Sequence, residues 1–221
     1  NDLFYRDPPN IEFIENNLAG GQSMQMYEKD EIHITGVGVS DLDRILDPSN
    51  PLNRDLVVAP PSFSVSYIGF NTNMPPFDDQ KFRQALNHAI NKELIASQVL
   101  SNLVVPAYGI LPPGFPGHNE DLDGLTFDPE KARKLLSESK YAGFLVNIPS
   151  DEPHYQLAQE LLSASQSSLS DQLPRIIISV PGTGGSVGLD LEVVVDMWER
   201  ELGVVVDFQQ VEWATFLKDL D

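Results

Sequence analysis

The stretch YIGFNTNMPPFDDQKFRQALNHAINK, residues 67–92, decides the fold class of this 221-residue chain. It begins with residues typical of a β-strand, passes through a Pro-Pro turn and continues into an amphipathic helix. Asp78 or Asp79 is the expected N-cap, because an aspartate accepts hydrogen bonds from the free N–H groups of a first helical turn. The apolar residues that follow recur at helical spacing and are predicted to face a core: Phe82, Leu86, Ala89 and Ile90.

Strand patterns and helix patterns alternate along the rest of the chain. Strands are predicted at residues 10–16, 31–37, 55–59, 64–70, 175–180 and 204–210. Helices are predicted at residues 19–29, 40–46, 91–100, 128–136, 153–169 and 189–202, with a last one after residue 212. The alternation predicts an α/β fold, with a mixed β-sheet flanked by helices.

Local signals also predict how some of these elements begin, end and face the core. Ser40 is the expected cap of the helix at 40–46, and Gly203 is expected to end the helix at 189–202 in a left-handed conformation. The strand at 175–180 is expected to be buried on both faces. Within the helix at 153–169, the residues expected to share the buried face are Leu157, Leu161 and Ala164.

Length and linker pattern predict a single domain over residues 1–221. A chain of this size can bury a core of its own, and no low-complexity linker divides it. Residues 104–127 are rich in proline and glycine and are predicted to form a long connection over the surface.

Composition excludes several classes of partner. The formal net charge is −19, and without clustered basic residues neither nucleic acid nor an anionic membrane is an expected partner. There is no cysteine, which excludes disulfides and thiolate metal sites. No apolar run approaches the roughly 20 residues of a membrane helix. The first residues lack a signal-peptide pattern, and we expect the chain to begin inside a longer protein.

No catalytic or metal-binding pattern emerges. His33, His88, His118 and His154 fall on different predicted elements without paired spacing, so no metal or other cofactor is expected. Ser186 lies in the glycine-rich turn GTGGSVG, but the turn is not a GxSxG elbow and no base can be assigned to it. We expect no enzyme, and an α/β hydrolase that uses Ser186 is the alternative.

Two places could contact a ligand. The turn after the strand at 175–180 contains Gly182, Thr183, Gly184, Gly185 and Ser186. Glycines between a strand and a helix expose backbone N–H groups that suit an anionic ligand, although a connector without a ligand fits the pattern equally well. Trp213 follows Glu212 at the start of the last helix; its position favours core packing, with stacking on a ligand as the alternative. Trp198 lies on an apolar helical stripe and is predicted to be core.

Several segments together resemble the peptide- and nickel-binding family of ABC-importer solute-binding proteins. They are YIGFNT (67–72), PPFDDQKFRQALNHAINK (75–92), LPPGFPG (111–117), FDPEKARKLL (127–136), MWERELGVVV (197–206) and EWATF (212–216). The second segment is the most specific, and the order and spacing fit over nearly the whole chain. Residues 143–174 match the family poorly and are interpreted as an insertion-like segment.

The resemblance implies the second lobe of a two-lobed, periplasmic-binding-protein type II-like fold. Members of the family hold a small solute, with peptide as the default, between two α/β lobes and deliver it to an ABC permease in the membrane. The implied location is extracellular or periplasmic, with a membrane anchor on the full-length protein. The implied partners are therefore the solute, the permease and the missing first lobe of the same protein. The resemblance also places Trp213, Glu212 and the Gly182–Ser186 turn at the ligand cleft.

The resemblance has an energetic consequence for one lobe alone. A micromolar ligand is bound with about −8 kcal/mol. If each lobe supplies half of that free energy, a single lobe binds its ligand at millimolar strength or weaker. A further alternative to a solute-binding lobe is a protein-interaction module that uses the proline-rich residues 104–117.

Overall fold

The computed structural model of the chain describes residues 10–17, 22–58, 62–165, 173–182 and 187–219. Backbone contacts divide the chain into two compact units, Asn1–Ala59 (unit 1) and Pro60–Asp221 (unit 2). We describe each unit by itself, and the expected single domain over residues 1–221 stays a prediction. Within the described ranges, no helix has the length and apolar character needed to cross a membrane.

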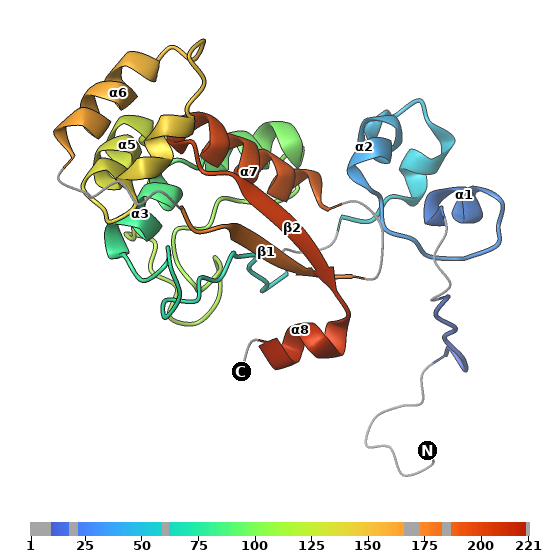
Figure 1. Ribbon diagram of the computed structural model, residues 1–221. Helices are drawn as coiled ribbons and strands as arrows, with labels where there is room; N and C mark the ends of the chain where they lie inside the picture. Colours follow the sequence, from blue (N-terminus) through green and yellow to red (C-terminus); the bar gives the residue numbers. More distant parts are fainter. Residues whose placement is uncertain (1–9, 18–21, 59–61, 166–172, 183–186, 220–221) are drawn as a thin grey trace. The chain divides into compact units, whose positions relative to one another are not determined.

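The described residues of unit 1 form three short helices: α1 (Ser23–Glu28), α2 (Val39–Leu46) and the 3-10 helix η1 (Pro51–Asp55) (Figure 1). Arg44 of α2 pairs with Glu28 of α1 and with Asp41, the second at 2.7 Å. Two expectations need correction. The helix predicted at 19–29 is helical only from Ser23 in the described residues, and α2 is preceded by Gly38 without a side-chain cap, so Ser40 lies inside the helix.

Unit 2 contains the remaining helices and the sheet (Figure 1). Its elements are α3 (Gln80–His88), α4 (Lys92–Leu94), the π-helix η2 (Ile95–Val99), α5 (Pro129–Ser137), the 3-10 helix η3 (Ala142–Asn147), α6 (Tyr155–Ala164), β1 (Ile176–Pro181), α7 (Leu189–Leu202), β2 (Val206–Val211) and α8 (Trp213–Asp219). Residues 104–127 contain no helix or strand, and none of their side chains is buried. Helices α3, α5 and α7 lie together on one side of the sheet (Figure 1).

The sheet of the described residues has two strands. β1 and β2 run parallel, with Ile176 opposite Val206 and Pro181 opposite Val211. Helix α7 connects them, as a parallel pair requires. The α/β class is therefore confirmed, but the observed sheet is parallel where a mixed one was expected.

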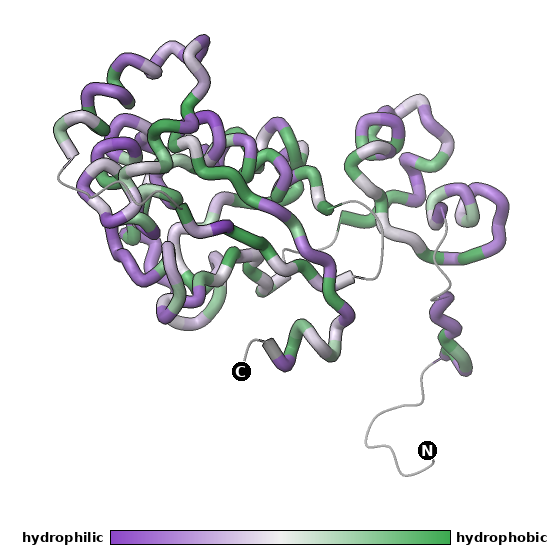
Figure 2. Tube along the Cα trace, viewed as in Figure 1, coloured by the Kyte–Doolittle hydropathy of each residue, from purple (hydrophilic) through white to green (hydrophobic). Residues whose placement is uncertain are grey.

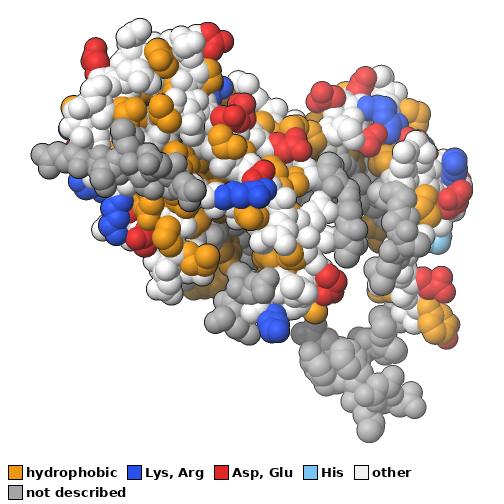
Figure 3. Space-filling model, in the orientation of Figure 1, with side chains coloured by type: hydrophobic (Ala, Val, Ile, Leu, Met, Phe, Trp, Pro, Cys, Tyr) orange, Lys and Arg blue, Asp and Glu red, His pale blue; other side chains and the backbone are white. Residues whose placement is uncertain are grey.

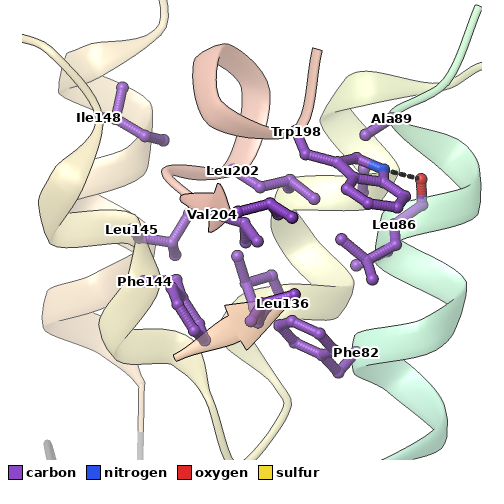
Figure 4. Close-up of a cluster of buried hydrophobic side chains, with 14 of the residues drawn as sticks. Phe82, Leu86, Ala89, Leu136, Phe144, Leu145, Ile148, Trp198, Leu202 and Val204 are labelled. Carbon is purple, nitrogen blue, oxygen red and sulfur yellow. Dashed lines mark hydrogen bonds between the residues drawn. The ribbon is translucent and has the colours of Figure 1, made fainter. Parts of the chain in front are cut away.

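The core of unit 2 forms where α3, α5, η3 and α7 meet the sheet (Figure 4). The largest side chains with almost no exposure there include Trp198, Phe82, Leu86, Leu136 and Leu202. The Trp198 indole, predicted to be core, donates a 2.9 Å hydrogen bond to the Leu86 carbonyl (Figure 4). Burying several large apolar side chains of this kind, each contributing about 1.5–3 kcal/mol, stabilises the unit.

The helix boundaries of unit 2 follow local signals. Asp79 accepts hydrogen bonds from the Lys81 and Phe82 N–H groups at the start of α3, and Asp128 accepts one from Lys131 at the start of α5. Gly203 ends α7 with φ 69°, a left-handed conformation that suits glycine. The predicted helix ends at Asp79 and Gly203 are confirmed.

Four segments that were predicted to be strands are not strands in the described residues. Residues 10–16, 31–37, 55–58 and 64–70 form no β-ladder in the described chain, and Ala59 lies outside the described residues. A strand pattern fixes which side chains face a core, but a strand also needs a neighbouring backbone to receive its hydrogen bonds. None of these segments has such a neighbour among the described residues.

Two predicted burial patterns also need correction. β1 is covered on one face only, because Ile176 is buried while Ile177 is 45% exposed. The neighbouring strand β2 has a similar one-sided pattern, because hydrophobic and hydrophilic residues alternate along most of its length (Figure 2). In α6, Ala158 is buried and Leu161 packs against the core as expected, but Leu157 is 38% exposed and Ala164 is also exposed, so the expected face is only partly correct.

Candidate functional site

The candidate site lies at the carboxyl ends of the two parallel strands, both of which point toward α8 (Figure 1). The N–H of Gly182, directly after β1, donates a 2.9 Å hydrogen bond to the carbonyl of Val211, the last residue of β2. Glu212 and Trp213 follow Val211 directly. The register therefore brings three of the sequence-predicted residues, Gly182, Glu212 and Trp213, to one edge of the sheet, the edge where ligands bind in parallel α/β sheets.

Trp213 is the first residue of α8 and is 57% exposed. Its ring stacks on Phe216 one turn later, with ring centroids 5.9 Å apart and planes 21° apart. Stacking on Phe216 leaves much of the Trp213 surface open. Position alone favoured core packing for Trp213, and the structure places it at the surface.

The Glu212 carboxylate hydrogen-bonds to backbone N–H groups of the same chain. One carboxylate oxygen accepts hydrogen bonds from the Ala214 N–H at 2.9 Å and from the Thr215 N–H at 3.3 Å. These bonds satisfy N–H groups that the start of a helix leaves free. Glu212 therefore caps the start of α8, directly before Trp213.

The glycine-rich turn is described only at its start. A Cβ atom built on Gly182 would lie 3.7 Å from the side-chain amide carbon of Gln210, so this amide borders the edge. Thr183, Gly184, Gly185 and Ser186 lie outside the described residues, and their roles stay predictions.

Sequence reasoning missed Phe216 and Gln210 as neighbours of the site. The spacing of Trp213 and Phe216, three residues apart on one helix, was a signal for their contact. The position of Gln210 had no such signal, because it depends on the register between β1 and β2.

Two hollows and three histidines of the described chain are not lined by, or bonded to, the residues of this edge. One hollow of about 480 Å³ lies by α5 and α6 and includes Lys81, Lys134 and Leu161; another of about 510 Å³ lies within unit 1. His88, His118 and His154 each hydrogen-bond to a different backbone carbonyl, those of Thr126, Leu111 and Arg200. Among the described residues, no group of three or more potential ligands is placed to hold a metal ion.

The chemistry of the edge suits binding. It combines the exposed aromatic ring of Trp213 with the side-chain amide of Gln210. Hydrophobic side chains lie at the surface of unit 2, interspersed with acidic and basic ones (Figure 3). Such a surface can stack on an apolar group and hydrogen-bond to an extended backbone.

Comparison with known proteins identifies a family that matches the full chain and relatives that match part of it. The family model described as "Bacterial extracellular solute-binding proteins, family 5 Middle" matches residues 1–221. The glutathione-binding protein GsiB of Salmonella choleraesuis (strain SC-B67) is 34% identical over 154 residues, which are 69% of this chain and 29% of that protein. The dipeptide-binding protein of Escherichia coli (strain K12) is 35% identical over 111 residues, 48% of this chain and 21% of that protein.

Solved structures share the fold. The murein tripeptide-binding protein MppA of Escherichia coli superposes with a TM-score of 0.58 at 22% identity, covering 89% of this chain and 34% of that one. This chain therefore spans about a third or less of the length of the relatives that it matches.

Proposed function

Because the chain belongs to the bacterial extracellular solute-binding proteins of family 5, we propose that it is one ligand-binding lobe of a protein that delivers a peptide to an ABC importer. The other lobe, contributed by the same longer protein, closes over the solute, and the closed protein docks on a permease in the membrane. The protein acts outside the cytoplasmic membrane, and its role is binding rather than catalysis.

The observation that carries the proposal is the family match over all 221 residues. Both sequence relatives named above are peptide binders by name, one for glutathione and one for dipeptides. What these two solutes share is a peptide backbone with a free carboxylate. We therefore take a short peptide as the substrate class.

In this proposal Trp213 is the residue that touches the solute. Its exposed face stacks on a side chain or a peptide plane of the ligand, a contact that can contribute about 0.5–1.5 kcal/mol beyond buried area. Glu212 acts as a positioning residue, because its carboxylate caps α8. The turn from Gly182 to Ser186 offers backbone groups to the ligand.

The test is calorimetric titration of the product of the complete reading frame that contains this chain. We expect glutathione, dipeptides or longer peptides to bind with micromolar or lower Kd, and Trp213→Ala to weaken that binding about tenfold or more. Trp213→Phe, which keeps an aromatic face, is the matched control and should retain most of the affinity. Absence of binding by every peptide, or unchanged binding by the alanine variant, would overturn the proposal.

A further inference from the structure

Helix α6 is attached to unit 2 with much less buried surface than the helices around it. Among residues 149–164, all of which the structure describes, Ala158 is the only fully buried one. Three side chains of α6 pack against the core but stay partly exposed: Tyr155, Leu161 and Leu162. By contrast, the nine-residue helix α3 buries four of its residues. Because an alanine removes little apolar area from water, burial holds α6 only weakly.

One side-chain hydrogen bond links this part of the described chain to the rest of unit 2. Between described residues, the backbone hydrogen bonds of residues 149–164 join near neighbours in the sequence only, such as the Ala158 N–H and the His154 carbonyl. The link is made by His154, whose Nε2 lies 2.9 Å from the Arg200 carbonyl oxygen in the last turn of α7. A carbonyl oxygen only accepts, so Nε2 carries the proton. His154 is the N-cap residue of α6, but its side chain reaches α7 instead of capping its own helix.

The His154 ring lies beside a buried ion pair. Its Nε2 is 3.9 Å from the Glu201 carboxylate, which pairs with Arg133 at 2.7 Å. The Nε of Arg133 is buried and has no hydrogen-bond partner among the described residues. Keeping a charge pair and an unpartnered donor away from water costs free energy, which hydration returns. Movement of α6 away from α7 lets water reach these groups, so the hydration of the pair favours opening.

We propose that residues 149–164, the α6 arm, open from unit 2 as one cooperative segment while α3, α5, α7 and the sheet stay folded. His154 is the latch of this arm, because its bond to Arg200 holds the arm closed and its release exposes the buried ion pair. Proteins open in such units where burial is sparse, at a lower free energy than their cores require. The candidate binding edge includes no residue of the arm, so this inference does not depend on the proposed function.

Thiol labelling tests the proposal, because the 221-residue chain contains no cysteine and a single introduced thiol is the only one present. Ala158→Cys places the thiol beneath the arm, and Ala85→Cys is the matched control in α3, since both alanines are 0% exposed. Without denaturant, we expect Ala158→Cys to react with dithionitrobenzoate at least tenfold faster than Ala85→Cys. A smaller ratio would mean that α6 opens only together with its surroundings and would overturn the proposal.

Substitution of His154 identifies the latch. His154→Ala removes the bond to Arg200, whereas His154→Gln keeps an amide donor and is the matched control. In the Ala158→Cys background, we expect His154→Ala to speed labelling at least tenfold and His154→Gln to change it less than threefold. Labelling of Ala85→Cys should stay within threefold in both variants. A weaker effect of His154→Ala, or equal acceleration at the two thiols, would contradict the latch.

Amide hydrogen exchange of the unsubstituted chain gives a readout without any introduced thiol. We expect the amides of α6 to share one opening equilibrium and to exchange at least tenfold faster than the slowest amides of α3, α5 and α7. Amides of α6 that exchange as slowly as those of the three other helices would overturn the proposal, whatever the thiols show.

Discussion

The indole Nε1 of Trp198 donates a 2.9 Å hydrogen bond to the carbonyl of Leu86, which lies 112 residues earlier in the chain. Both side chains are almost fully buried, Trp198 on α7 and Leu86 on α3. This bond joins the most clearly predicted helix of the chain to the crossover helix of the sheet (Figure 4). The position of the β1–α7–β2 unit on its helical layer depends on this contact and on the packing around it.

Trp198→Phe should destabilise unit 2 by about 2 kcal/mol or more, because it leaves a cavity and removes a buried hydrogen-bond donor. Urea unfolding followed by far-ultraviolet circular dichroism measures the change. Trp213→Phe is the matched control, and since Trp213 is exposed its effect should stay within about 0.5 kcal/mol. Equal effects of the two substitutions would show that the burial of Trp198 is wrongly assigned.

Glu201→Gln should destabilise the protein by about 3 kcal/mol, because it leaves the buried Arg133 guanidinium without its counter-charge. The Arg133–Glu201 pair is 2.7 Å long, and its side chains are only 5% and 11% exposed. The pair Arg175–Asp207 has the same length, with side chains 74% and 51% exposed. Asp207→Asn should therefore change stability by no more than about 0.5 kcal/mol. Thermal unfolding of the two variants side by side measures the difference, and a larger effect at Asp207 would contradict the role of burial.

Gly203→Ala should cost about 2 kcal/mol or more, because φ at this position is 69° and an added Cβ would collide with the Phe144 carbonyl oxygen. Gly69→Ala is the control: the nearest atom to its added Cβ, on the Tyr67 ring, is 3.9 Å away. Chemical denaturation of both variants gives the comparison. If alanine were tolerated at position 203 as well as at position 69, the left-handed conformation assigned to Gly203 would be wrong.

The pH dependence of stability should change in Tyr141→Phe. The Tyr141 hydroxyl donates a 2.6 Å hydrogen bond to Asp78, and burial together with this carboxylate raises the pKa of Tyr141 to about 12. The raised pKa means that the phenol form stabilises the fold below pH about 10, and that this contribution is lost as pH rises toward 12. The variant should therefore be less stable at neutral pH and should lose less stability between pH 10 and 12.

The loss of stability at acidic pH provides a second check on the contact between Tyr141 and Asp78. Hydrogen bonds from Tyr141 and Lys140 lower the pKa of Asp78, so its contribution is present above the ordinary aspartate pKa and is lost as pH falls through the lowered value. Tyr141→Phe should therefore also reduce the stability that is lost on acidification. Tyr108, whose pKa is also raised to about 12, is common to both proteins and cancels in the comparison. If stability depended on pH identically in the variant and its parent, the contact between Tyr141 and Asp78 would not contribute to that dependence.

The helices were predictable because their signals are local. Asp79 and Asp128 are side-chain caps within a few residues of the groups that they satisfy, and Gly203 ends α7 through its own backbone freedom. Strands were mispredicted at the described residues 10–16, 31–37, 55–58 and 64–70 because pairing needs a second backbone that no local pattern specifies. The strands β1 and β2, which α7 connects, were predicted correctly in place, but the exposed face of β1 was not predicted.

The candidate site was predictable only in part. Parallel strands place their carboxyl ends together, so the neighbourhood of Gly182 and Trp213 followed from the α/β pattern. The use of the Glu212 carboxylate as a helix cap is a local contact that the position of Glu212 before α8 could have indicated, but it was not predicted. The exposure of Trp213 depends on tertiary packing.

Fluorine NMR of the 221-residue chain labelled with 5-fluorotryptophan tests the central claim most directly. The chain has two tryptophans, so two signals are expected, and Trp213→Phe assigns them. Titration with glutathione, dipeptides and longer peptides should shift the Trp213 signal with a midpoint of about 1 mM or higher and leave the buried Trp198 signal in place. A Trp213 signal that never moves, or that saturates below micromolar peptide, would contradict the assignment of this chain as one half of a peptide-binding cleft.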